Sequence, residues 1–147
     1  MKLERKERVI IVGCGRLGRR LATMLSDKGY QVIIIDNDES SFSKLPETFG
    51  GFTIKADGID VDTLKYADID EATMLVACTG NDNINSLIAQ IASRIFAVPN
   101  VYVRFEDTDK ELLIKGFNIH GIYPFKLTMG VFEDTIFGKN EEEEEEL

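Results

Sequence analysis

The sequence predicts an α/β fold built on a doubly wound parallel sheet of six strands. Three observations predict it. Short runs of β-branched apolar residues alternate with segments of helical periodicity along the chain. The glycine-rich hexapeptide Gly13-Cys14-Gly15-Arg16-Leu17-Gly18 follows the first apolar run directly. Asp36 closes the second run about twenty residues later. Together these features are typical of a Rossmann-type domain that binds a nucleotide.

The N-terminal part of the chain contains a complete βαβ unit. Val9–Val12 is short and wholly apolar, which is typical of a strand buried on both faces of a parallel sheet. Apolar residues then recur at helical spacing: Leu17, Leu21, Met24 and Leu25. Gly29 supplies the stop for this helix. Val32–Ile35 is the second buried strand, and Asp36 ends it.

The same alternation continues to residue 137. The later predicted strands are Phe52–Lys55, Met74–Cys78, Val101–Val103 and Ile119–Tyr123. The later predicted helices are Val61–Tyr66, Asn83–Phe96, Thr108–Phe117 and Leu127–Phe137. The second of these helices has an apolar face made of Ile84, Leu87, Ile88, Ile91, Ala92 and Ile95. Right-handed crossovers and the glycine loop favour the strand order 3-2-1-4-5-6.

Composition and charge exclude several classes of protein. The 147 residues suffice for one domain with a core, and 44% hydrophobic with 29% charged residues is a globular balance. No apolar run approaches the roughly 20 residues of a membrane span. Residues 1–8 are too charged for a signal peptide, so we expect a cytoplasmic protein. Glu141–Glu146 supply six of the nine net negative charges, and the mildly acidic remainder argues against a nucleic-acid partner.

The hexapeptide assigns a task to each of its glycines. Gly13 permits the tight turn, Gly15 lets the backbone approach a phosphate, and Gly18 allows close packing of helix and strand. The helix N-terminus offers free N–H groups and a partial positive charge to the phosphate. Arg16, beside Leu17 in the loop, is either a bidentate phosphate ligand or a solvated surface arginine.

The end of the second strand is the predicted ribose site. The Asp36 carboxylate is placed to accept hydrogen bonds from ribose hydroxyls, and it disfavours the 2′-phosphate of NADP. Asn37 follows it and joins the candidate binding residues. Asp38 either shares the ribose or caps the helical segment that begins at Glu39, and the capping role is the favoured interpretation.

Further candidates follow the later strands, because ligands of open α/β sheets bind at the carboxyl ends of strands. Asp57 is predicted to face the adenosine, and Thr79 with Gly80 to line the crevice floor. Asp82 and Asn85 each have two interpretations, as cap of the next helix or as ligand contact.

Arg104 ends the fifth strand. Its side chain either reaches a phosphate or pairs with Glu106 or Asp107. Cys14 and Cys78 end neighbouring strands in the predicted order; we expect reduced, packed residues, with a redox pair as the alternative.

The sequence gives little support for catalysis or for a metal site. A dehydrogenase needs a substrate domain with an acid or base, and nothing after Phe137 could form one. His120 is alone in a predicted strand and is interpreted as structural. No Cys-His, Ser-His or metal-ligand constellation is present.

Six short motifs resemble the TrkA-N domain, which is also called KTN or RCK, over roughly residues 8–137. They are the glycine hexapeptide, Ile35–Asp38, Ala56-Asp57, Thr79–Asn85, Val103-Arg104 and Gly121–Pro124. The resemblance implies a cytoplasmic regulatory subunit of a potassium channel or transporter, peripheral to the inner membrane through its pore. An adenine nucleotide (ATP, ADP, AMP, NAD or NADH) would be its effector and would not be consumed.

The resemblance also implies residue roles and an assembly. Gly13, Gly15 and Arg16 would bind phosphate, Asp36 ribose, and Asp57 with Thr79 the adenosine, while Arg104 would approach the phosphates. Family members dimerise and often form octameric rings beneath the pore.

Two departures from the family pattern matter. Many relatives have glutamate after the closing proline, where Phe125 stands here, so a cation site at the phosphates is not expected. Many also continue into a C-terminal lobe. Either this chain works as a minimal subunit or a second TrkA-type subunit supplies that lobe.

The terminal helix favours assembly on physical grounds, because its apolar residues spread around more than one helix face. They are Leu127, Met129, Val131, Phe132, Ile136 and Phe137. We therefore expect this crossover helix to reach a second subunit in a self-complementary homodimer. The predicted organisation is a charged segment at 1–8, the nucleotide-binding domain at 9–126, the dimerisation helix at 127–138 and a disordered acidic tail at 139–147.

Two other functions remain open from the residues. One is an NAD-dependent oxidoreductase subunit that needs a partner for catalysis. The other is a stand-alone nucleotide sensor unrelated to ion transport.

Overall fold

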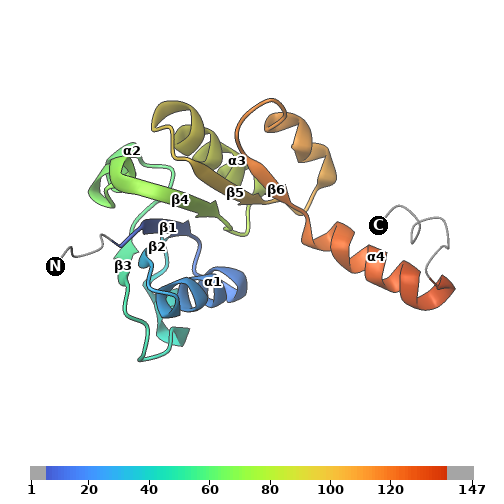
Figure 1. The fold of residues 1–147 in the computed structure, drawn as a ribbon, viewed down its shortest axis with the longest axis horizontal. Coiled ribbons are helices and arrows are strands. Elements are labelled where there is room, and N and C mark those ends of the chain that lie inside the picture. Colours follow the sequence, from blue (N-terminus) through green and yellow to red (C-terminus); the bar gives the residue numbers. More distant parts are fainter. Residues whose placement is uncertain (1–5, 139–147) are drawn as a thin grey trace.

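A six-stranded parallel sheet forms the centre of the molecule, in the order β3-β2-β1-β4-β5-β6, which confirms the prediction (Figure 1). The computed structural model describes residues 6–138. The strands are β1 (Arg8–Val12), β2 (Gln31–Asp36), β3 (Phe52–Lys55), β4 (Ala72–Ala77), β5 (Asn100–Arg104) and β6 (His120–Ile122). Each neighbouring pair of strands is parallel.

Helical segments connect the strands. The α-helices are α1 (Arg16–Asp27), α2 (Val61–Tyr66), α3 (Asp82–Gln90) and α4 (Pro124–Phe137). The 3₁₀ segments are η1 (Glu39–Lys44), η2 (Ile69–Glu71) and η4 (Thr108–Leu113), and η3 (Ile91–Ile95) is a π-helical turn. The predicted disordered tail at 139–147 lies outside the described residues, as does most of the charged segment 1–8.

The two faces of the sheet are covered by different helices (Figure 1). The α1 helix packs on one face, where Ala22 and Leu25 meet Ile11 and Ile34. The α2 and α3 helices cover the other face around a larger apolar cluster that includes Ile88. Right-handed crossovers require this division, because the chain moves outward from β1 in opposite directions before and after β3. The reversal leaves a crevice at the carboxyl ends of β1 and β4.

The helix predicted at Thr108–Phe117 is wrong in type and length. Only Thr108–Leu113 is helical, and it is a 3₁₀ segment. Within the predicted range, Ile114 is buried, whereas the side chains of Leu112 and Phe117 are exposed. The segment therefore lacks the apolar stripe that holds an α-helix against a core.

The helix predicted at Asn83–Phe96 is present but is not uniform. It begins at Asp82, and its last turn widens into the π-helical η3, where the Phe96 N–H donates to the Ile91 carbonyl at 3.3 Å. Leu87 and Ile95 were predicted on its apolar face and are instead exposed. The π turn adds one residue and so rotates Ile95, at its end, away from the α-helical stripe, whereas Leu87 precedes the turn and is not affected by it.

The terminal helix α4 extends away from the body of the domain (Figure 1). It begins at Pro124, three residues before the predicted start at Leu127, because proline is well suited to the first helical position. None of its residues is buried. The exposed apolar side chains are Phe125, Leu127, Met129, Val131, Phe132, Ile136 and Phe137.

Candidate functional site

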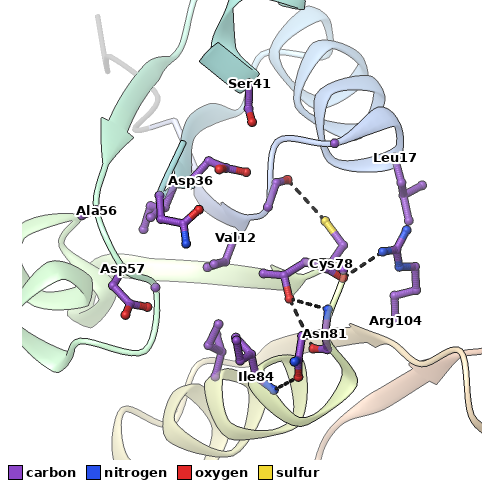
Figure 2. Close-up of a pocket in the computed structure, with 18 of the residues that line it drawn as sticks. Val12, Leu17, Asp36, Ser41, Ala56, Asp57, Cys78, Asn81, Ile84 and Arg104 are labelled. Atoms are coloured by element: carbon purple, nitrogen blue, oxygen red, sulfur yellow. Dashed lines mark hydrogen bonds between the residues drawn. The ribbon is translucent and has the colours of Figure 1, made fainter. Parts of the chain in front are cut away.

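A cleft of about 510 Å³ lies at the carboxyl edge of the sheet, where the strand order reverses between β1 and β4 (Figure 2). This switch point is where open α/β sheets bind ligands. Ten of the eleven residues predicted for the site line it: Gly13, Gly15, Arg16, Leu17, Asp36, Asn37, Asp57, Thr79, Gly80 and Arg104. The apolar part of the lining includes Val12, Ile35, Ile84 and Ile88. These ten residues make up most of the polar lining, to which Ser41 and Asn81 add two side chains that were not predicted.

Gly18 is the predicted residue that does not line the cleft, and it has a packing role instead. A Cβ atom at Gly18 would lie 1.8 Å from the carbonyl oxygen of Gly13. Gly13 itself has φ +110°, and a Cβ there would lie 2.7 Å from the Cys78 carbonyl oxygen. These contacts are with backbone atoms, so neither glycine has room for a side chain. The loop is thereby pressed against both α1 and β4.

The N-terminus of α1 opens into the cleft. Gly15 is its N-cap residue, no side chain caps the helix, and its first turn holds no acidic residue. Apart from Gly15 itself and its two chain neighbours, no protein atom lies within 4 Å of an ideal Cβ at Gly15, so the space above the loop is open. The first amide N–H groups of a helix have no intrahelical acceptor. Here they form a concentrated set of donors for an anion.

Asp36 connects the glycine loop to the end of β2. Its Oδ2 accepts from the Cys14 N–H at 2.8 Å, and its Oδ1 accepts from the Asp38 N–H at 2.9 Å. Each carboxylate oxygen retains a second acceptor position. The side chain is half-buried on the cleft wall and can still accept hydrogen bonds from a ligand.

Asp38 has the capping role favoured from the sequence. Its Oδ1 accepts from the Ser40 N–H at 3.0 Å and from the Ser40 hydroxyl at 2.7 Å, which closes the first turn of η1. These hydrogen bonds, the hydroxyl first, hold the pKa of the exposed Asp38 carboxyl below its ordinary value. The Asp38 carboxylate therefore serves as the N-cap of η1.

Asn85 is the site residue whose role the sequence did not reveal. Its side chain is fully buried. Its Oδ1 accepts from the Thr79 N–H at 2.8 Å and the Thr79 hydroxyl at 2.6 Å, while its Nδ2 donates to the carbonyls of Thr79 and Arg104, each at 3.0 Å. It neither caps α3 nor contacts the cleft. The signal was available, because Asn85 shares a helical face with Ile88 and Ala92, and a buried amide must find partners.

Asp82 was expected as a candidate cap of α3, and that expectation is wrong by one residue. Asn81 is the N-cap, and its Oδ1 accepts from the Ile84 N–H at 3.0 Å. The Asp82 carboxylate reaches across instead to the N–H groups of Glu106 and Asp107, each at 3.0 Å. It ties the start of α3 to the loop that follows β5.

Arg104 does not pair with Glu106 or Asp107, so that interpretation is wrong. Its guanidinium Nη2 donates to the Thr79 carbonyl at 2.8 Å (Figure 2). Within residues 6–138 the structure records no carboxylate partner for it. The two acidic residues have their backbone N–H groups bound by Asp82, which holds their loop in place. Arg104 therefore contributes a half-buried positive charge to the cleft wall.

Both cysteines are buried and carry free thiols. The Cys78 Sγ donates to the Gly13 carbonyl at 3.6 Å, and the Cys14 Sγ to the Ser41 carbonyl at 3.4 Å. Burial raises the pKa of Cys78 to about 12. Burial, and then the Asp36 carboxylate, raise the pKa of Cys14. Both thiols are thus held protonated, which disfavours thiolate chemistry.

Two further findings concern the described part of the chain. Between residues 6 and 138, His, Cys, Asp and Glu do not gather in any group of three or more that could hold a metal ion. In the same range, no helix combines the length and apolar character needed to cross a membrane.

His120 is exposed and stacks on Tyr102 with ring centroids 5.2 Å apart.

The fold and this cleft define a Rossmann-type α/β domain with its crevice at the topological switch point. The model of the TrkA-N domain family matches residues 9–123, and the chain belongs to that family. It is 41% identical over 99 residues to the Trk system potassium uptake protein TrkA of Streptomyces coelicolor, a match that covers 67% of this chain and 44% of the relative. The chain spans about half the length of the curated relatives it matches.

Solved structures show the same fold. The TrkA-N domain of the inner membrane protein ybaL from Escherichia coli superposes with a TM-score of 0.76 at 16% identity, covering 90% of this chain and 98% of that one. The GsuK channel bound to NAD gives a TM-score of 0.73 at 20% identity, covering 91% and 24%. GsuK bound to ADP gives 0.74 at 20% identity, covering 91% and 35%.

Proposed function

We propose that this chain is a nucleotide-sensing regulatory subunit of a potassium channel or transporter, and that an adenine nucleotide is its effector. The observation that carries the proposal is the open cleft between the uncapped N-terminus of α1 and the Asp36 carboxylate. Membership of the TrkA-N family supports the link to potassium transport.

The cleft has a region of hydrogen-bond donors and positive charge that is suited to the phosphates of a nucleotide, and an acceptor region that is suited to its ribose. The α1 N-terminus and Arg16 are assigned to the phosphates, because both present positive charge beside the open space over Gly15. Asp36 is assigned to the ribose hydroxyls, for which it has free acceptor positions. Asp57 and Thr79 are assigned to the adenosine side.

The network beneath Thr79 suggests how a bound ligand influences the rest of the domain. Thr79 lines the cleft, and its backbone is joined to Asn85 on α3 and to Arg104 on β5. A ligand that binds more tightly to one arrangement of these elements shifts the population toward it. The effector therefore acts by binding, and no chemical step is assigned to the chain.

We assign the assembly to α4. Its apolar side chains are exposed on all sides, and in our proposal they meet a second copy in a homodimer. Dimers would assemble into an octameric ring on the cytoplasmic side of a membrane pore, with a second TrkA-type subunit as the source of any C-terminal lobe.

Calorimetric titration of the full chain with ADP and with NAD tests the nucleotide site. We expect binding, and we expect Asp36→Ala to weaken it about tenfold or more, because the ribose hydroxyls lose their acceptor. Asp70→Ala removes an exposed carboxylate that does not line the cleft and is expected to leave the affinity unchanged. Equal affinity of the wild-type chain and Asp36→Ala would refute the ribose assignment.

A further inference from the structure

A groove of about 530 Å³ lies on the surface of the molecule between α1 and the end of η1. Its lining residues are Arg19, Arg20, Thr23, Met24, Asp27, Lys28, Lys44 and Pro46. None of them lines the cleft, so the nucleotide site leaves this groove without a role. Four of the lining residues are cationic and one is acidic, whereas the chain as a whole has a net charge of -9. The groove therefore has the opposite sign of charge from the whole chain.

The four cations of the groove have no carboxylate partner among residues 6–138. The ion pair recorded in that range joins Arg8 to Asp68. Three of the cations belong to α1 or to its C-cap, and Lys44 comes from the end of η1. Like charges that converge from two segments repel one another unless an anion lies between them. The groove is therefore suited to an acidic ligand.

The chain itself contains a segment that is complementary to the groove. Glu141–Glu146 are six consecutive glutamates, and they follow the end of α4 at Phe137 after a short connection. They lie outside the described residues. The cations of α1 extend from Arg19 to Lys28 over about 14 Å, at a rise of about 1.5 Å per residue. An extended chain covers about 3.3 Å per residue, so about four or five glutamates match this length.

The direction of α4 indicates which copy of the chain supplies the glutamates. Figure 1 shows α4 leading away from β6 and from the body of the domain, so that its end lies clear of α1. Only residues 138–140 separate the end of α4 from Glu141. The glutamates therefore begin beside the far end of α4, where the proposed homodimer places a second copy.

We propose that the groove beside α1 binds the glutamate run 141–146 of a second copy of this chain. The inference rests on the homodimer that the proposed function assigns to α4, and it adds an electrostatic contact to that apolar interface. Arg19 and Arg20 provide guanidinium groups that can each bind a carboxylate through two hydrogen bonds. Lys28 and Lys44 provide point charges on either side. Because the groove lies outside the cleft, this contact leaves the nucleotide site open.

Zero-length crosslinking of the full chain tests the contact. A water-soluble carbodiimide activates a glutamate carboxyl, and a lysine amine in contact with it displaces the urea and forms an amide bond. Mass spectrometry of the digested protein is expected to find links from Glu141–Glu146 to Lys28 and Lys44. Lys65 and Lys115 are exposed outside the groove and should stay unlinked. The links should disappear at 1 M salt, where the screening length is only about 3 Å.

Isotope labelling identifies the copy that supplies the glutamates. Unlabelled chains and chains labelled with heavy nitrogen are unfolded in urea and refolded together, so that mixed dimers form. A contact between the two copies of a symmetric dimer joins a labelled peptide to an unlabelled one in about half of the links. A contact within one copy never does so.

The double variant Arg19→Gln/Arg20→Gln removes half of the positive charge of the groove and keeps both of its lysines as crosslinking targets. We expect the yield of links to Lys28 and Lys44 to fall several-fold, because the attraction for the glutamates is weaker. The matched control is Lys65→Gln/Lys115→Gln, which removes the same charge from surfaces outside the groove and should leave the yield unchanged.

Several results would overturn the inference. They are links spread equally over the four lysines, links formed only within one copy, and a yield that the arginine variant does not lower. If light scattering shows a dimer whose glutamates do not link to the groove, the inference fails and the homodimer stands. If the chain is a monomer, both fail together.

Discussion

At the scale of single residues, Asn85 organises one wall of the cleft although it never touches the open space. Its amide satisfies two donors of Thr79 and two carbonyl oxygens on different segments. A buried amide with four hydrogen bonds holds its neighbours in one arrangement, because any displacement leaves a buried polar group unpaired. Thr79 and Arg104 reach the cleft in a defined geometry for this reason.

Replacing Asn85 should therefore be costly. Asn85→Leu is expected to lower the free energy of unfolding by about 2–4 kcal/mol, because the Thr79 N–H and the Arg104 carbonyl lose their partner in a buried site. Urea titration measures the change. Asn83→Leu is the matched control, since Asn83 is exposed in the same helix and should change stability by less than about 0.5 kcal/mol. Similar losses in both variants would contradict the role of Asn85.

The raised pKa of Cys78 predicts that the folded chain loses stability at alkaline pH. Its pKa in the folded chain is raised to about 12 from an ordinary value of 9.0, so the folded state holds the thiol proton more tightly than the unfolded state does. This contribution to stability is complete below pH 9 and is lost as the pH rises from 9 toward 12. Each pH unit in that window costs up to about 1.4 kcal/mol.

The prediction is tested by measuring the free energy of unfolding at pH 8 and pH 10.5 in the wild-type chain and in Cys78→Ala. We expect the wild-type value to fall by about 1–2 kcal/mol more than that of the variant. Cys14 is present in both proteins and cancels in the comparison. The same pH dependence in both would show that Cys78 titrates in the folded chain as it does in the unfolded chain.

At the scale of elements, the exposed apolar side chains of α4 indicate that this helix forms an interface. Seven large apolar side chains are exposed on this one helix, and a helix that is apolar all round is normally buried. In water we expect the full chain to be a dimer at micromolar concentration by light scattering, and Phe132→Asp to shift it to the monomer. Asp134→Asn, at an exposed polar position on roughly the opposite side of the same helix from Phe132, should leave the dimer intact. A monomeric wild-type chain would contradict the assignment of α4.

The elements also show which features could be predicted from sequence. The strands β1 and β2 were predictable because residues such as Val9 and Ile34 are apolar and β-branched on both faces. The type of η4 was not, because Leu112 and Ile114 are equally apolar in the sequence and only tertiary packing decides which is buried. The π turn η3 was hidden for the same reason.

The candidate site divides in the same way. The glycine loop and Asp36 were predictable because spacing along one βαβ unit defines them. The partner of Arg104 was not, since the Thr79 carbonyl is brought to it by pairing of β4 with β5 and leaves no mark on the sequence.

At the scale of the whole molecule, the proposed function requires coupling between the cleft and a pore. In liposomes that contain the potassium pore and the assembled subunit, we expect ADP or NAD to change the potassium flux. Asp36→Ala should reduce this response at a fixed nucleotide concentration, because its cleft is less occupied. Saturating nucleotide should restore the response in part, since the assembly itself is unaltered. A flux that ignores nucleotide while the ligand binds would favour a sensor unrelated to ion transport.

The three glycines of the loop differ in whether the structure would tolerate their substitution during evolution. Gly13 and Gly18 are confined by backbone atoms, the 1.8 Å approach being the closest, and no replacement of a side chain elsewhere relieves that. Gly15 faces open space, and beyond its two chain neighbours no protein atom lies within 4 Å of a Cβ added there. In a lineage that no longer binds the ligand, Gly15 is therefore free to be substituted, whereas Gly13 and Gly18 must remain glycine. The variability of this one position across descendants would record which of them still bind.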